Sequence, residues 1–129
     1  MAPKLTAQQV RIKRAYEPAA KEDGARILID RLWPRGIKKE ELELSEWTRD
    51  LAPSTELRKW FKHDPALWDE FQRRYKAELA EHPDILQSLR ERAHKENLCI
   101  VYGARDEQYN NAVVLRDVLL HPEKLADAS

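Results

Sequence analysis

Two continuous apolar runs limit the folds that this chain can adopt. The first, at residues 27–29, opens the stretch ILIDRLWPRG and stops abruptly in charged residues, tryptophan, proline and glycine. The second, LCIVYGA at residues 98–104, also ends in charged residues. Short apolar runs of this kind are typical of strands that are buried on both faces of a sheet. We therefore predict two central strands, at residues 26–32 and 98–104.

The segment between the two runs has helical patterns. Trp68, Phe71, Tyr75 and Leu79 recur at spacings of three, four and four, which predicts a helix over residues 65–80 with an aromatic face toward the core. Parallel strands need a long crossover connection, and helices usually supply it. The two central strands are therefore expected to be parallel neighbours.

Shorter signals define the remaining elements. Val10 and Ile12 alternate with basic residues, which predicts a half-exposed strand over residues 9–16 that suits a sheet edge. The other predicted elements are a loop at 17–24, a turn at 33–36, a short helix from about residue 45, a helix that opens at Ser54 and ends at His63, a helix at 83–95, and a last helix from Asn110 or Asn111 to His121. The order β-β-α-α-α-β-α predicts an α/β fold with a small, mainly parallel sheet flanked by helices. We expect one domain over residues 9–122, a flexible lead-in at 1–8 and a tail at 123–129.

The balance of acidic and basic residues means that the protein as a whole has no strong electrostatic field. The 23 basic and 23 acidic side chains cancel, so attraction to nucleic acid or to a membrane has to be local. Residues 11–39 hold nine Lys or Arg and four acidic residues, which is a local basic bias. No segment approaches the roughly 18 apolar residues of a membrane span, and no signal-peptide core is present. One cysteine, Cys99, excludes an internal disulfide, so we expect a cytoplasmic protein.

Polar side chains follow both central strands. Asp30, Arg31 and Arg35 lie at or just past the end of the first run, and Arg105 and Asp106 follow the second. The carboxyl ends of parallel strands meet at one edge of a sheet, where ligands of open α/β sheets bind. Forked guanidinium donors near the N-terminus of the last helix suit phosphate or carboxylate, and an acid there could orient a water or accept a proton. The pattern therefore predicts an anion-binding cleft.

A structural explanation of the same residues is also open. Asp30 and Arg31 would then pair with neighbours at the strand end, and Asn110 or Asn111 would only cap the last helix. Trp33 lies at the same edge and is the one tryptophan that we retain as a stacking platform for a ligand.

Other catalytic and metal-binding patterns have weaker support. His63 and Asp64 have the form of a catalytic or metal-binding pair, but Asp64 is also a natural N-cap before Pro65. The four histidines show no zinc-ligand spacing, so neither a metal nor a cofactor is expected. Ser54 follows no nucleophile-elbow pattern and Cys99 lies inside a strand, so neither is expected to be a covalent nucleophile.

Three longer motifs resemble one known family. They are IDRLWPRG at 29–36, WTRDLAPSTELRKWFKHDPALWDEF at 47–71 and VYGARDEQYNNAVVL at 101–115. In this order they resemble the domain of unknown function 488 (DUF488) family, in its YeaO-like branch, over most of the chain after the first strand. The resemblance implies membership but no reaction, because the family has no established activity. By resemblance, the polar motif positions of the family fall on Asp30, Arg31, Arg35, Ser54, Arg58, His63, Asp64, Asp106, Asn110 and Asn111. Tyr109 departs from the family pattern, which often has histidine before the asparagine pair.

Three functions are compatible with the sequence. The leading hypothesis is a cleft for a phosphorylated or otherwise anionic small molecule, in which Asp106 or His63 would carry any chemistry. Its arginines would be Arg31, Arg35, Arg58 and Arg105. The second hypothesis is a nucleic-acid-binding or regulatory module whose basic region 11–39 contacts phosphates while Trp33 stacks on a base. The third is a structural interaction domain without catalysis. Whether the protein is an enzyme, and how many copies assemble, stays open.

Overall fold

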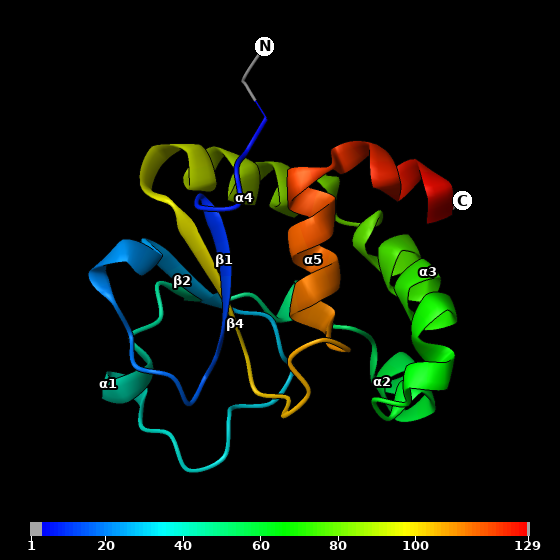
Figure 1. Ribbon diagram of the computed structural model, residues 1–129, viewed down its shortest axis with the longest axis horizontal. Coiled ribbons are helices and arrows are strands. Elements are labelled where there is room, and N and C mark those ends of the chain that lie inside the picture. The colour runs from blue at the N-terminus through cyan, green and yellow to red at the C-terminus, as the bar shows by residue number, and fades with distance from the viewer. Residues whose placement is uncertain (1–3, 129) are drawn as a thin grey trace.

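The chain folds around a four-stranded parallel sheet (Figure 1). The computed structural model describes residues 4–128, without the side chains of residues 126–128. The strands are β1 (Val10–Arg14), β2 (Ala25–Leu28), β3 (Glu46–Trp47) and β4 (Leu98–Tyr102), and their order in the sheet is β1-β4-β2-β3. The helices are α1 (Lys39–Leu42), α2 (Thr55–Phe61), α3 (Trp68–Leu79), α4 (Pro83–Glu96) and α5 (Asn111–Leu120). Shorter 3-10 turns occupy Lys21–Asp23, Arg49–Leu51, Pro65–Leu67 and Pro122–Ala128.

The α/β fold and the two parallel central strands are confirmed. In the register of β2 and β4, Ile27 lies opposite Ile100 and Leu28 lies opposite Val101. Every residue of both strands is buried. Successive side chains of a strand point to opposite faces. Accordingly, Ile27 and Ile100 join the large core under α2 to α5, whereas Leu28 and Val101 join a smaller core under the segment 33–47. The first strand lies at a sheet edge, as its alternating pattern predicted.

Capping side chains start the helices where the sequence predicted. Ser54 caps α2, Asp64 caps the 3-10 turn that leads into α3, and Asn110 caps α5. Each side-chain oxygen accepts a hydrogen bond from a backbone N–H of the first turn, which otherwise has no partner within the helix. The caps thus fix where α2 and α5 begin relative to the strand ends.

The prediction of a short helix near residue 45 is wrong. Residues Glu46–Trp47 instead form β3, which extends the sheet beside β2. The flanking backbone also bonds to β2, because Ser45 N–H donates to Arg26 O and Thr48 N–H donates to Leu28 O. Pairing with the sheet therefore overrides the weak helical pattern of this segment.

The first central strand is shorter than predicted. Its ladder ends at Leu28, and the next two carbonyl groups bind side chains instead of a strand. Asn111 Nδ2 donates to Ile29 O at 3.2 Å, and Trp47 Nε1 donates to Asp30 O at 2.6 Å. The chain therefore leaves the sheet at the position where the polar stretch begins.

Parts of the predicted lead-in and of the predicted tail pack against the folded domain. Of the predicted lead-in, residues 1–3 lie outside the described part, and Leu5 packs against the large core. Within the predicted tail, the 3-10 turn Pro122–Ala128 contacts α3 and α5.

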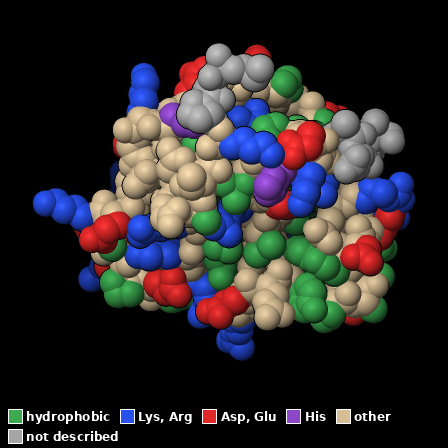
Figure 2. Space-filling model, turned by 45° about the horizontal axis from the view of Figure 1, so that its top comes forward, with side chains coloured by type: hydrophobic (Ala, Val, Ile, Leu, Met, Phe, Trp, Pro, Cys, Tyr) green, Lys and Arg blue, Asp and Glu red, His purple; other side chains and the backbone are tan. Residues whose placement is uncertain are grey.

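No helix in the range 4–128 is long and apolar enough to cross a membrane. On the face in Figure 2, Lys and Arg side chains are interspersed with Asp and Glu.

Candidate functional site

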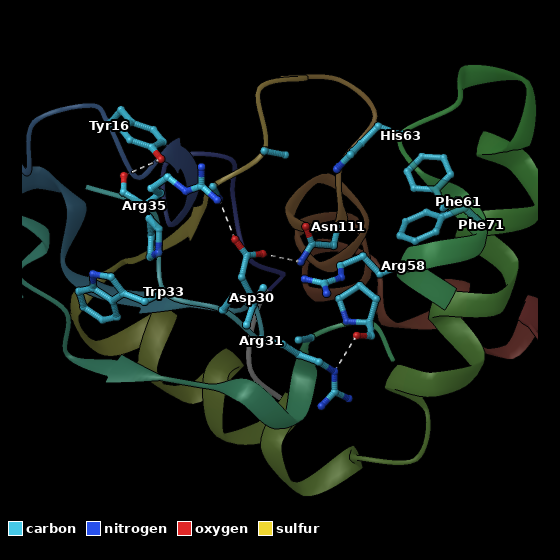
Figure 3. Close-up of a pocket in the computed structure, with 16 residues that line it drawn as sticks. Tyr16, Asp30, Arg31, Trp33, Arg35, Arg58, Phe61, His63, Phe71 and Asn111 are labelled. Carbon is cyan, nitrogen blue, oxygen red and sulfur yellow. Dashed lines mark hydrogen bonds between the residues drawn. The ribbon is translucent and has the colours of Figure 1, made fainter. Parts of the chain in front are cut away.

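A cavity of about 230 Å³ opens at the C-terminal ends of β2 and β4 (Figure 3). It is lined by the turn after β2, by α2, by the loop after β4 and by the first turn of α5. The lining residues are Tyr16, Asp30, Arg31, Leu32, Trp33, Pro34, Arg35, Ala52, Pro53, Arg58, Phe61, His63, Phe71, Gly103, Ala104 and Asn111. Charged groups and an aromatic wall therefore share one small space.

The Asp30 carboxylate joins the two central strands. Its Oδ2 accepts a hydrogen bond from Gly103 N–H at 2.8 Å, and its Oδ1 accepts one from Asn111 Nδ2 at 3.2 Å. A side chain at Gly103 would crowd this contact, because a Cβ there would lie 3.3 Å from Oδ2. Burial raises the pKa of Asp30, although both hydrogen bonds and the charges of Arg58 and His63 oppose that shift.

Two arginines reach the cavity without a partner. Arg35 belongs to the turn after β2, and Arg58 belongs to α2. Figure 3 shows their side chains extending into the cavity from opposite sides of Asp30. Across the described part of the chain, neither guanidinium group makes a hydrogen bond or an ion pair. The Arg35 backbone is held in place, since its carbonyl accepts a hydrogen bond from Tyr16 Oη at 3.0 Å.

Arg31 and Trp33 are anchored to the scaffold. Arg31 Nε donates to Pro53 O at 3.0 Å, which ties the turn after β2 to the residue before the α2 cap. Trp33 Nε1 donates to Ile37 O at 2.7 Å, and its ring meets the Trp47 ring edge-on at a centroid distance of 5.4 Å. Trp33 therefore lines the cavity as a fixed wall.

His63 lies at the cavity rim, just after the end of α2. Both Lys62 and His63 have left-handed backbone conformations, with φ of 49° and 56°. A non-glycine residue in this region carries a modest conformational cost. His63 Nδ1 lies 3.1 Å from Tyr109 O. Because a carbonyl oxygen can only accept, Nδ1 is the donor in this hydrogen bond.

The polar residues of the loop after β4 do not converge on the cavity as predicted, although Gly103 and Ala104 of this loop line it. Asp106 Oδ1 accepts hydrogen bonds from Gln108 N–H and Tyr109 N–H, both at 2.9 Å, so it caps its own loop. These backbone hydrogen bonds lower the pKa of Asp106, which makes it a weak proton acceptor. Arg105 is exposed and Asn110 is a buried cap, so neither lines the cavity. Of the residues predicted in this region, only Asn111 reaches it.

Known proteins with similar sequences establish the family of this chain. The sequence profile described as "DUF488-N3i: Inactive DUF488-N3 subclade" matches residues 9–129. The chain belongs to the DUF488 family. One relative, "Uncharacterized protein YeaO" of Escherichia coli (strain K12), is 46% identical over 110 residues, which cover 85% of this chain and 96% of that protein. Another, "Uncharacterized protein Rv3073c" of Mycobacterium tuberculosis (strain ATCC 25618 / H37Rv), is 39% identical over 111 residues, which cover 86% and 93%. No solved structure matches the chain.

Membership of the DUF488 family, with a YeaO relative, confirms the resemblance found in the motifs. The structure also shows what Tyr109 of this DUF488 chain contacts. Its ring meets Trp68 edge-on at a centroid distance of 5.3 Å, and its backbone carbonyl contacts His63. The aromatic ring at this position is therefore used in packing, and only the backbone atoms reach the rim histidine.

Ser54, a motif position in the DUF488 resemblance, lies beside the cavity in a second hollow. Besides capping α2, its Oγ donates to Glu78 Oε2 at 2.6 Å, and its N–H donates to Glu78 Oε1 at 2.8 Å. These bonds tie α2 to α3 without facing the main cavity.

Replacing Ser54 with alanine is therefore expected to lower the free energy of unfolding by about 1–2 kcal/mol, through loss of the cap and of one bond to Glu78. Urea unfolding measures this change. Ser54→Thr keeps a hydroxyl and is the matched control. A wild-type stability for Ser54→Ala would contradict the capping role.

Sequence reasoning missed the aromatic wall of the cavity. Phe61 and Phe71 stack at a centroid distance of 4.1 Å, and both are buried. Their helical spacing indicated core packing, which is correct, but periodicity cannot show that both residues also line a cavity. Tyr16 and Leu32, exposed by 50% and 63%, form an apolar rim that no pattern in the sequence marked.

Proposed function

We propose that this DUF488 protein binds a small phosphorylated or otherwise anionic molecule in the cavity beside Asp30. The observation that carries the proposal is the pair of guanidinium groups of Arg35 and Arg58, which line one cavity and lack partners within the described residues. Guanidinium groups offer forked donors that match phosphate and carboxylate oxygens. With Arg31, the cavity carries three arginines against one acid.

Binding without turnover is the form of this proposal that the observations support best. The profile that matches the chain is described as an inactive subclade. Asp106, a predicted proton carrier, bonds its own loop, and His63 is the one remaining candidate at the rim. Clusters of His, Cys, Asp or Glu that could hold a metal are absent from the described part of the chain. Binding of a ligand is therefore enough to account for the cavity, and the proposal includes no catalytic step.

The basic region 11–39 is a weaker candidate for nucleic acid than its composition suggested. Lys13 and Arg26 are committed to Asp23, which accepts from both, and Arg14 Nε donates to Ala104 O. Lys13 and Arg26 are therefore paired with an acid inside the fold, and Arg14 uses one donor on the backbone, which leaves fewer free cations in this region for a phosphate backbone. A cytoplasmic location is part of the proposal, because a chain with a single cysteine has no internal disulfide that would indicate an oxidising compartment.

The proposal is tested by the melting temperature of the wild type against phosphate, sulfate, sugar phosphates, nucleotides and short oligonucleotides. A ligand that binds only the folded state at 100 times its Kd adds about 2.7 kcal/mol of stability, which is several degrees. Arg35→Ala/Arg58→Ala should abolish the shift. Arg73→Ala/Arg105→Ala removes the same charge outside the cavity and should preserve it.

Two results would overturn the proposal. The first is an absence of any shift with the wild type across the panel at millimolar concentrations. The second is a shift that survives in Arg35→Ala/Arg58→Ala. A shift caused only by oligonucleotides, and lost steeply with added salt, would instead support the nucleic-acid hypothesis, since release of counterions makes that binding strongly salt-dependent.

A further inference from the structure

The Asp30 carboxylate has acceptor capacity that the protein does not use. Each of its oxygens accepts one hydrogen bond, from Gly103 N–H and from Asn111 Nδ2. An ionised carboxylate offers about four acceptor positions. Ion-pair partners of Asp30 are absent from the described residues, although Arg58 and His63 lie close enough for their charges to act on it. The free energy lost when this partly buried acid leaves water is therefore only partly compensated by its hydrogen bonds.

The arginines and the aspartate that line the cavity do not form ion pairs with one another in the described structure. Arg35 and Arg58 are long and flexible side chains, yet neither closes on Asp30 to form an ion pair. Figure 3 shows the carboxylate between the two guanidinium groups. An anion alone would satisfy the arginines, but its charge would repel Asp30. A ligand with a donor group near its anionic group would satisfy all three side chains.

We propose that the ligand of this cavity is an anion that also carries an N–H donor, with its anionic group held by Arg35 and Arg58 and its donor held by Asp30. The inference rests on the proposed function and adds the substrate class. It covers amines that bear a phosphate ester, and amino acids. The pKa of Asp30, which burial raises, agrees with a carboxylate that gains from an additional donor.

Asp30 is the residue that selects this class. Its structural bonds to Gly103 and Asn111 could be made in large part by a neutral acceptor, so an acid at this position points to a charged or strongly polar partner. Hydrogen bonds to an ionised group are stronger than neutral ones. The donor group of the ligand should therefore improve affinity by at least about tenfold over a matched anion without it.

The test compares two matched pairs of probes by calorimetry and thermal melting. Ethyl phosphate is paired with O-phosphoethanolamine, and 3-phenylpropionate is paired with phenylalanine. Within each pair the second molecule adds only an amine, which is protonated at neutral pH. We expect the amine to raise affinity at least about tenfold in the pair whose anion fits. Asp30→Asn should remove the difference, whereas Glu107→Gln, which removes an exposed acid from the adjacent loop, should preserve it.

The outcomes separate the two proposals. If an amine-free probe binds the wild type as tightly as its partner, the anion site stands and the inference about Asp30 is overturned. The same conclusion follows if the amine preference persists in Asp30→Asn. If no probe of either pair binds and the wider anion panel also fails, the proposed function is overturned together with this inference. Should Asp30→Asn fold poorly, the comparison of probes with the wild type still decides.

Discussion

Replacing Asp23 with alanine is expected to lower the free energy of unfolding by about 3–5 kcal/mol. Asp23 is fully buried in the turn before β2 and accepts hydrogen bonds from Lys13 Nζ, Ala20 N–H and Arg26 Nη1. The Arg26 side chain is also buried, and its remaining bond is from Nε to Leu42 O. Among the described residues Arg26 forms an ion pair with no other acid, so without Asp23 it becomes a buried cation that lacks an opposite charge.

The same variant should change how stability depends on pH. Burial by itself raises the pKa of Asp23, but hydrogen bonds from Ala20, Lys13 and Arg26 outweigh it, and the net pKa lies below 3.8. A carboxyl whose pKa is lowered in the folded state adds stability above its unfolded value, and loses that contribution as pH falls through the folded value. The difference between wild type and Asp23→Ala should therefore be full at pH 7 and shrink below about pH 3.8.

Urea unfolding at pH 7 and at pH 3 measures both effects. Glu70→Gln is the matched control, because Glu70 pairs with Arg73 and Arg74 on the surface of α3. It removes an equal charge, and we expect a far smaller change. An Asp23→Ala protein as stable as Glu70→Gln at pH 7 would show that the buried pair contributes little.

Replacing Gly24 with alanine is expected to lower the free energy of unfolding by about 3 kcal/mol. Gly24 has a φ of 67°, where a side chain is strained. A Cβ at this position would also overlap Glu96 O and would lie 2.5 Å from Asn97 O. The end of α4 packs on this turn because Asn97 O accepts the hydrogen bond from Ala25 N–H that precedes the β2–β4 ladder. Neither backbone segment can move without disturbing that ladder.

Gly36→Ala separates the two causes. Gly36 also has a positive φ, of 80°, but a Cβ there would meet no atom within 4 Å. Its substitution should cost only the conformational part, about 1 kcal/mol. Chemical denaturation of both variants gives the comparison. If Gly24→Ala and Gly36→Ala lower the free energy of unfolding equally, the close approach of α4 to the turn at Gly24 does not add to the cost of a side chain there.

Strands and caps could be predicted because their causes are local. The side chains at 27–29 and 98–101 carry no charged, amide or hydroxyl group that burial would leave unsatisfied, so burial on both faces follows from composition. Ser54, Asp64 and Asn110 cap helices because a short polar side chain beside a helical pattern can reach the first N–H groups. The edge of the sheet that bears the cavity follows from the parallel order of two strands.

Local sequence signals could not predict which polar side chains line the cavity. Asp30, Arg31, Trp33, Arg35, Arg58, His63 and Asn111 line it, as the motifs suggested, whereas Ser54, Arg105, Asp106 and Asn110 do not. The second group consists of side chains that find hydrogen bonds nearby or that face solvent. Asp106 bonds N–H groups two and three residues ahead, and this local competition is invisible to an argument from strand ends.

The sequence by itself determined the family, the parallel central strands, the helix starts and the edge of the sheet where polar residues gather. These depend on spacing along the chain and on the chemistry of single residues. Only the tertiary structure decided that 46–47 joins the sheet, and that Arg35 and Arg58 stay apart from Asp30 within one cavity. Those outcomes depend on which distant groups compete for each donor and acceptor. That competition is settled by packing in three dimensions, since residues such as Asp30 and Asn111 meet across 81 positions of the chain.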